Sequence, residues 1–383
     1  MKKDKRSGTL PHAVFSPIIS MRLLPFLLLS TLFATTPLRA CSVPVFRYAL
    51  EHWQPDVFQA VVLHRGPLTA AEESLVRNFG AEGLAGRLHA NLSLQTVDLA
   101  ADPSPEMLEL ARASGTHTLP AVVVRFPRTT SSGATVWSGG LRAESIATLL
   151  ESPARKELVE RLGGGESAVW VLLESGDRDK DDAAAKLVET RLAELSRVLS
   201  LPALDPQDIV NGLVSVPHDQ LRLEFSLLRV ARRDAAEQPF VQMLLGTESD
   251  LADVEEPIVF PVFGRGRALY ALVGAGIKRE TIDEAATFLI GKCSCQVKEQ
   301  NPGADLLLAG DWDGLMKAQG TAAPDLPTLS QLAESAPVTV SISGGEPAVA
   351  VAEPVGSYTQ TLSIAGAVAA ALLAAGIFLR RKG

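Results

Sequence analysis

The 383-residue sequence is poor in the residues on which many functional sites depend: it has three cysteines, six histidines and 5% aromatic residues. Three cysteines are too few for a small domain stabilised mainly by disulfides. The histidines are scattered, which excludes a histidine-rich metal site, and no Walker loop, nucleophile elbow or HExxH motif is present. We therefore expect no bound metal and no cofactor.

Hydrophobic residues, by contrast, make up 46% of the chain, and charged residues 21%. This composition is too apolar for a disordered chain, and the length is too great for one ordinary domain. We therefore expect two globular domains with additional segments at the ends.

Residues 1–40 are predicted to be an export signal peptide, because basic residues precede an apolar run from Leu23 to Ala34. Translation from Met21 would give a more compact signal, so both start positions remain open. Processing is expected between Ala40 and Cys41.

The junction before this cysteine resembles the lipobox of bacterial lipoproteins, in which the cysteine becomes the acylated first residue. Arg39 fits that pattern poorly, and Leu38 fits the site of ordinary signal peptidase poorly. Cys41 is therefore a candidate for lipidation, with ordinary cleavage as the alternative.

A second apolar segment, Leu362 to Leu379, contains 18 uncharged residues and is followed by three basic ones. A helix rises about 1.5 Å per residue, so this segment approaches the ~30 Å hydrocarbon core of a bilayer. We expect a transmembrane helix at 359–380, with a buried alanine-rich core helix as the alternative. The basic residues place the tail, 381–383, in the cytoplasm and the bulk of the chain outside. Small residues four positions apart, such as Gly366 and Ala370, also permit a homodimer through this helix.

The exported part of the chain is acidic. Removing the six basic and one acidic residues of the signal peptide from totals of 36 and 44 leaves 30 and 43, a net charge of −13. No basic patch with interleaved aromatic residues is present, so nucleic acid is not an expected partner. The expected partners are a protein or peptide in the periplasm or at the membrane, and the lipid bilayer.

Composition also indicates the domain boundaries. Residues 319–358, rich in Ala, Pro, Ser and Thr, are typical of a flexible stalk, and Gly163-Gly164-Gly165 marks a joint. The two expected domains are therefore residues 41–162 and 163–318.

In the first domain, apolar periodicity predicts elements in the order α-β-α-β-α-β-β-α. They are expected near residues 45–53, 58–63, 69–79, 92–98, 105–113, 118–124, 136–137 and 142–150. This order, with Pro120 opening the third strand and Gly140 following the fourth, resembles the thioredoxin-like fold. In that family the proline is cis and faces the active-site loop, and the resemblance carries this position to Pro120.

The second domain repeats this ending. Pro257 opens a strand, Gly264-Arg265-Gly266-Arg267 turns it, and Gly276 precedes a helix; the proline-to-glycine separations in the two domains are 20 and 19 residues. Strands near 168–173 and 221–230 and a helix near 181–199 are expected upstream. We infer an α/β fold of two tandem thioredoxin-like domains followed by a C-terminal transmembrane helix.

Redox activity in the thioredoxin family depends on two cysteines at a helix N-terminus. The equivalent loop, His64 to Leu68, keeps a Gly-Pro centre but has Arg65 and Leu68 at the thiol positions, so a dithiol cycle is excluded. His64 and Arg65 beside Pro120 are candidates for binding an extended peptide or an anion. The alternative is a solvated loop that only starts a helix.

The corresponding loop of the second domain, Ser175 to Asp182, is rich in acidic residues. Its alternate acids resemble the start of an EF-hand, but Asp182 and Val188 replace the glycine and glutamate that a calcium loop needs. The expected role of these acids is to cap a helix.

Cys293 and Cys295 form the only cysteine cluster. In the inferred fold they follow a helix that runs away from the active-site pole near Pro257. A structural pair, a bond from one of them to Cys41, a redox-active disulfide and a soft-metal site remain open. Cys293 and Cys295 are thus the catalytic candidates of an alternative function, thiol-disulfide or soft-metal transfer.

The start of the mature chain, Cys41 to Trp53, also resembles that of a group of exported, membrane-anchored bacterial proteins. Its aromatic residues Phe46, Tyr48 and Trp53 are expected in the core. We expect a single-pass membrane protein that binds or scaffolds a partner outside the cytoplasm, with an enzymatic role through Cys293 and Cys295 left open as the alternative.

Overall fold

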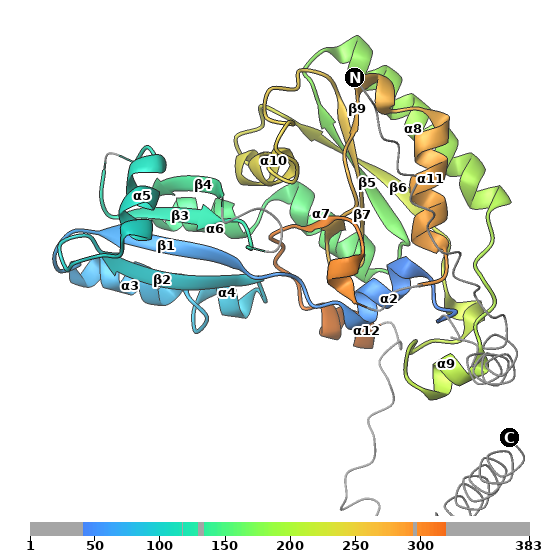
Figure 1. Cartoon of the computed structure of the whole chain (residues 1–383), viewed down its shortest axis with the longest axis horizontal. Helices are drawn as coiled ribbons and strands as arrows, with labels where there is room; N and C mark the ends of the chain where they lie inside the picture. Colours follow the sequence, from blue (N-terminus) through green and yellow to red (C-terminus); the bar gives the residue numbers. More distant parts are fainter. Residues whose placement is uncertain (1–40, 117, 129–133, 294–296, 319–383) are drawn as a thin grey trace, which may run out of the picture. The chain divides into compact units, whose positions relative to one another are not determined.

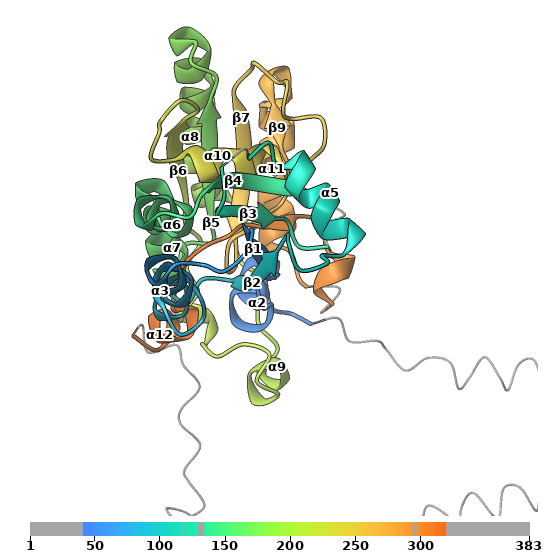
Figure 2. The same cartoon turned by 90° about the vertical axis from the view of Figure 1, so that its left-hand side faces the viewer.

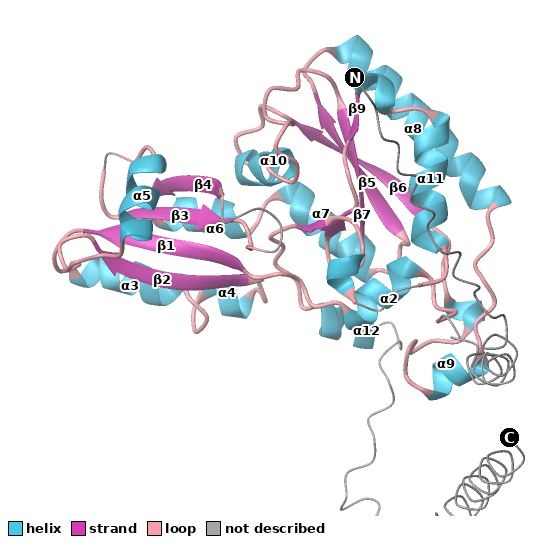
Figure 3. Cartoon of the chain, viewed as in Figure 1, coloured by secondary structure: helices cyan, strands magenta, loops and turns pink. Residues whose placement is uncertain are grey.

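The computed structural model describes residues 41–116, 118–128, 134–293 and 297–318 (Figure 1). The expected signal peptide, stalk and transmembrane helix all lie outside these residues. Within the described ranges, no helix is both long and apolar enough to span a membrane. The described residues form a mixed α/β structure with two sheets, each containing parallel and antiparallel strand pairs (Figure 3).

The first sheet has the strand order β2-β1-β3-β4. Its strands are β1 (Phe58–His64), β2 (Leu92–Asp98), β3 (Ala121–Arg125) and β4 (Thr135–Gly140). β1 is parallel to β2 and antiparallel to β3, and β3 is antiparallel to β4. β1 is thus a central strand. Its residues are almost all buried, so side chains on both of its faces pack against the protein interior.

Helices cover both faces of this sheet (Figure 2). α5 (Pro105–Ala113) packs on one face, where Met107 and Leu110 meet Val61 and Val123. α3 (Ala70–Phe79) and α6 (Ala143–Leu150) cover the other face, and the short helix α4 (Leu84–Arg87) follows α3.

The second sheet has the order β10-β8-β7-β5-β6, and β9 also pairs with β7. Its strands are β5 (Ala168–Glu174), β6 (Phe225–Ala231), β7 (Ile258–Phe263), β8 (Arg267–Ala268), β9 (Leu272–Val273) and β10 (Ala304–Asp305). β5 is parallel to β6 and antiparallel to β7, and β7 is antiparallel to β8. The pattern of orientations in the first four strands of each sheet is therefore the same.

One face of the second sheet contacts α8 (Arg178–Val198), α11 (Arg279–Ile290) and α2 (Val45–His52), and the other contacts α7 (Pro153–Gly163) and α10 (Gln238–Leu245). The remaining helices are α9 (Pro206–Val210), α12 (Trp312–Ala318) and three short 3₁₀ turns, η2 (His218–Gln220), η3 (Gly274–Gly276) and η4 (Lys298–Gln300).

Two helices pack differently from the sequence expectation. α2 was expected to begin the first domain but packs on α11 and β7, where Phe46, Tyr48 and Trp53 are 3%, 7% and 6% exposed. The prediction that these aromatic residues are core is confirmed. α7 was not predicted, and although it precedes Gly164 in the chain its Leu158 and Leu162 are buried with β5.

Some local predictions are confirmed by the structure. β2 has the expected bounds, and the helix expected at 105–113 is α5, which Ser104 caps. At the start of α3, Thr69 forms a capping box with Glu72, which was not predicted. β3 begins at Ala121 and not at residue 118, because Pro120 has no N–H to continue the ladder. α12 was not expected from the sequence: the helix begins at Trp312.

One core joins the two sheets. The α3 and α6 face of the first sheet and the α7 and α10 face of the second belong to a single cluster of buried residues. Buried Arg155, at the start of α7, reinforces this region by donating to the carbonyl oxygens of Thr148 and Leu149 at the end of α6 (2.6 and 2.7 Å). It therefore satisfies carbonyls that a helix C-terminus leaves without intrahelical partners.

Candidate functional site

The strand register brings the expected site residues together at one edge of the first sheet. β1 ends at His64 and pairs antiparallel with β3 through Leu63 and Ala121. The next residues outward are therefore His64 and Pro120. The Leu119–Pro120 peptide bond is cis, as the resemblance implied for this position.

The loop after β1 is held by its own hydrogen bonds. Gly66 has φ +73°, a left-handed conformation that glycine adopts without steric cost, and its carbonyl oxygen lies 2.7 Å from Nδ1 of His64. The Gly66 N–H donates to Oδ1 of Asp98, at the end of β2 (2.9 Å). Asp98 thus ties the loop to the neighbouring strand.

The charge of Asp98 is stabilised at this position. Hydrogen bonds from the backbone of Ala100 and of Gly66 lower the pKa of Asp98, and electrostatic interactions with His64 and Arg65 lower it further. The carboxylate that holds the loop therefore favours its charged form.

Arg65 itself is exposed. Within the part of the chain that the structure describes, its guanidinium makes no hydrogen bond or close ion pair. The first turn of α3 behind it is capped by Thr69 and Glu72, and these hydrogen bonds lower the pKa of Glu72. Arg65 is accordingly the side chain of this loop that is available to a partner.

At the same end of the sheet, the backbone just before Pro120 has hydrogen-bonding groups that no other described residue occupies. Thr118 is exposed, and neither Thr118 nor Leu119 has a hydrogen bond to another described residue, whereas the Pro120 carbonyl accepts from the N–H of Leu141 (3.1 Å). Two peptide units next to the loop can therefore pair with an added extended segment.

The loop after β5 in the second sheet has a different chemistry. Asp177 caps α8 by accepting from Asp179 and Lys180, and buried Asp181 accepts from the N–H and Oγ of Ser175 (2.7 and 2.8 Å) and from Gly176. These acids cap and close the loop, as expected. No group of three potential metal ligands was found among the described residues.

Cys293 lies at the other end of the second sheet from Pro257. Gly274, just before α11, donates to the Pro257 carbonyl (2.9 Å), and Cys293 follows the far end of that 12-residue helix, about 18 Å along its axis. Cys293 is 1% exposed and Cys41 is 6% exposed. Cys295 lies outside the described residues.

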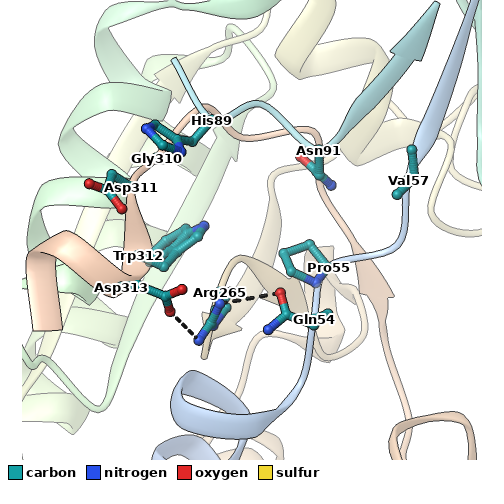
Figure 4. Close-up of a pocket in the computed structure, with 10 residues that line it drawn as sticks. All are labelled: Gln54, Pro55, Val57, His89, Asn91, Arg265, Gly310, Asp311, Trp312 and Asp313. Atoms are coloured by element: carbon teal, nitrogen blue, oxygen red, sulfur yellow. Dashed lines mark hydrogen bonds and ion pairs between the residues drawn. The ribbon is translucent and has the colours of Figure 1, made fainter. Parts of the chain in front are cut away.

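A cavity of about 340 Å³ lies near the links between the sheets (Figure 4). It is lined by Gln54, Pro55, Val57, His89, Asn91, Arg265, Gly310, Asp311, Trp312 and Asp313. Arg265 donates to the Leu50 carbonyl (2.8 Å) and to Asp313 (2.9 Å), and both ends of the Asn91 amide bond to backbone groups. These polar groups are occupied in joining segments of the protein.

The same bonds explain the Gly264–Arg267 motif. Gly264 and Gly266 have φ +58° and +95° in the turn after β7, and a Cβ at Gly264 would lie 2.8 Å from Ala49. The expectation of a hairpin turn is confirmed. Sequence reasoning missed the ion pairs next to it, in which Asp305 bonds Arg267 (2.9 Å) and Lys298 (2.8 Å). No sequence spacing signals these pairs, because their partners meet only in the folded chain.

No protein-family model matches the sequence, and a search of curated proteins finds no significant match.

Proposed function

We propose that this protein is a membrane-anchored binding or scaffold protein that captures a protein or peptide partner outside the cytoplasm, through two tandem thioredoxin-like domains without redox activity. The observation that carries the proposal is the edge where β1 and β3 end. There the loop that carries exposed Arg65 begins one residue beyond the paired Leu63 and Ala121, on the side of Pro120, and the backbone of Thr118 and Leu119 bonds to no other described residue.

The repeated strand pattern supports tandem domains. In each sheet a strand pairs parallel with the next strand of the chain and antiparallel with the third, which pairs antiparallel with the fourth. α6 follows β4 directly, and α11 follows β8 after β9 and η3; each helix packs on its own sheet or the core beside it. Such repetition is expected of two copies of one ancestral unit.

The chemistry of the edge favours binding over catalysis. A thiol cycle needs a cysteine in the loop after β1, and Arg65 and Leu68 stand there instead. An extended peptide would gain backbone hydrogen bonds from Thr118 and Leu119, and an acidic side chain or a carboxylate on it would pair with Arg65. The partner is therefore an extended segment that carries a negative charge near its contact with Arg65.

The anchor part of the proposal depends on the sequence. The 18 uncharged residues from Leu362 to Leu379 and the basic residues after them have the length and charge bias of a single transmembrane helix. A protein tethered in this way keeps its binding edge near the membrane surface, and the stalk expected at 319–358 would let that edge meet partners at some distance from the membrane.

The test is co-purification from detergent-solubilised membranes of cells that express the tagged protein. We expect a specific partner with the wild-type chain and at least a fivefold reduction with Arg65→Ala. The matched control is Arg77→Ala on α3, whose side chain is 69% exposed and should not affect capture. Equal capture by both variants would contradict a binding role for the edge.

A further inference from the structure

A second exposed arginine, Arg142, lies at the end of the first sheet that carries the proposed binding edge. The strand register pairs Leu63 of β1 with Ala121 of β3, and Ala121 with Gly140 of β4. β1 therefore ends, β3 begins and β4 ends side by side in one row. Arg142 follows two residues after the end of β4 and is the residue that precedes α6.

The position of the Arg142 side chain follows from its contact with the last residue of β4. A Cβ added at Gly140 would lie 3.4 Å from Nε of Arg142 and 3.8 Å from both Cδ and Cγ of the same side chain. The Arg142 side chain therefore folds back over the end of β4. It is exposed, and among the described residues it makes no hydrogen bond or ion pair. Its charge is accordingly available to a partner.

Arg65 and Arg142 stand on opposite sides of the start of β3. Neighbouring strands of a sheet lie about 4.8 Å apart, so the ends of β1 and β4 are about 10 Å from each other. Between them the chain enters β3 through Thr118 and Leu119, whose backbone bonds to no other described residue. Two guanidinium groups thus flank a short length of backbone that is open for pairing.

Carboxylates at this end of the sheet do not form ion pairs with the two arginines. Asp98 accepts from the N–H of Gly66 and so holds the loop after β1. Glu144, in the first turn of α6, makes no ion pair with Arg142 in the part of the chain that the structure describes. The exported chain is acidic as a whole, so an acidic segment would be repelled by most of its surface and attracted here.

We propose that Arg65 and Arg142 together select an extended segment that carries two acidic side chains two positions apart. This inference rests on the proposed function and defines the class of partner that the edge captures. In an extended segment, side chains two positions apart share a face and lie about 7 Å from each other. Two arginine side chains that start about 10 Å apart converge on such a pair, and each binds one carboxylate through two parallel hydrogen bonds.

Isothermal titration calorimetry of the purified mature protein in detergent, with four synthetic peptides, tests this selection. The peptides have acetylated and amidated ends, so that only their side chains carry charge. The first is Val-Asp-Val-Asp-Val, two others have asparagine in place of one aspartate, and the fourth has asparagine in place of both. We expect the Kd to rise about fivefold for each aspartate that is replaced.

The role of each arginine is tested with Arg65→Gln and Arg142→Gln and the same four peptides. Each variant should bind the peptide with two aspartates about fivefold more weakly than the wild type. Each should also no longer distinguish aspartate from asparagine at one of the two positions, because a lost pair makes the two changes non-additive. Arg142→Lys should recover part of the affinity, since it keeps the charge. The matched control is Arg77→Gln, at a side chain that is 69% exposed on α3, and it should bind as the wild type does.

The possible failures separate this inference from the proposed function. Equal affinity of Arg142→Gln and the wild type for the peptide with two aspartates would overturn the role of Arg142 and leave the edge as a peptide site. Equal binding of charged and uncharged peptides by the wild type would overturn the selection of acidic segments, and the proposed function would stand. No binding of any of the four peptides would contradict both.

Discussion

Replacing Arg155 by methionine tests the physical account of how the two sheets are joined. This side chain is 1% exposed, and besides its bonds to Thr148 and Leu149 it donates to Ser152 Oγ (3.0 Å). Burial lowers the pKa of Arg155 to about 10, so the guanidinium is still protonated at neutral pH. Its charge also lies at the negative end of the α6 dipole.

The expected loss of stability follows from these contacts. Methionine fills most of the space but leaves the buried carbonyl oxygen of Leu149 and the half-buried one of Thr148 without these donors, and a buried unpaired group costs about 1–3 kcal/mol. Removing a buried charge regains part of its desolvation cost, so we expect a net loss of about 3 kcal/mol in the free energy of unfolding.

The assay is urea unfolding of the mature protein followed by tryptophan fluorescence. The matched control, Lys156→Met, changes an exposed residue of the same helix and should alter the free energy by less than about 0.5 kcal/mol. A loss below about 1 kcal/mol for Arg155→Met would refute the view that this arginine is needed to satisfy the end of α6.

Three further predictions concern the binding edge and the ion pairs. Gly66→Ala should lower the free energy of unfolding by about 1 kcal/mol and weaken partner capture, because alanine disfavours φ +73°. Urea unfolding measures the first effect, and an unchanged free energy would contradict the argument that this position needs glycine. Because the pKa of Asp98 is lowered from 3.8 by its hydrogen bonds, its contribution to loop order should be complete above that value and lost as pH falls through the lower folded-state pKa. An NMR titration of the Gly66 amide would show this transition, and its absence in Asp98→Asn is the control. Asp305→Asn should cost about 3 kcal/mol, since the Asp305 side chain is 5% exposed and bonds two cations, whereas exposed Asp253→Asn should cost little in the same urea assay.

Local sequence signals predicted much of the fold. Thr69 and Ser104 each bond a residue three positions along the chain, so caps of this kind depend on local sequence alone. The alternating or continuous apolar runs of β1, β2 and β5 likewise depend on nearest neighbours. Features of this kind can be predicted from the sequence without knowledge of the fold.

Long-range packing was not predictable in this way. The periodicity of α2 predicts that one face of the helix is buried, but it does not show on which sheet that face packs. In the folded chain α2 packs on α11 and β7, and its first residue bonds to the end of α11. α12 was not predicted, because Asp311 and Gly314 are residues that favour turns, yet buried Trp312 begins a helix there.

The candidate site was predictable only in part. The resemblance supplied Pro120 and the loop of Arg65, and the register of Leu63 with Ala121 brings them together. The link from Asp98 to Gly66 could not be predicted, because Asp98 ends β2 whereas Gly66 lies in the loop after β1, and the two meet only in the folded chain.

Site-specific photocrosslinking tests the central claim that the edge of β1 and β3 captures a partner. A photoreactive amino acid is placed at exposed Thr118 in the full-length protein and, as a control, at Val198, which is 72% exposed at the end of α8. After irradiation of intact cells, we predict one discrete crosslinked species from Thr118 that is lost with Arg65→Ala. No such species, or the same pattern from Val198, would contradict the account.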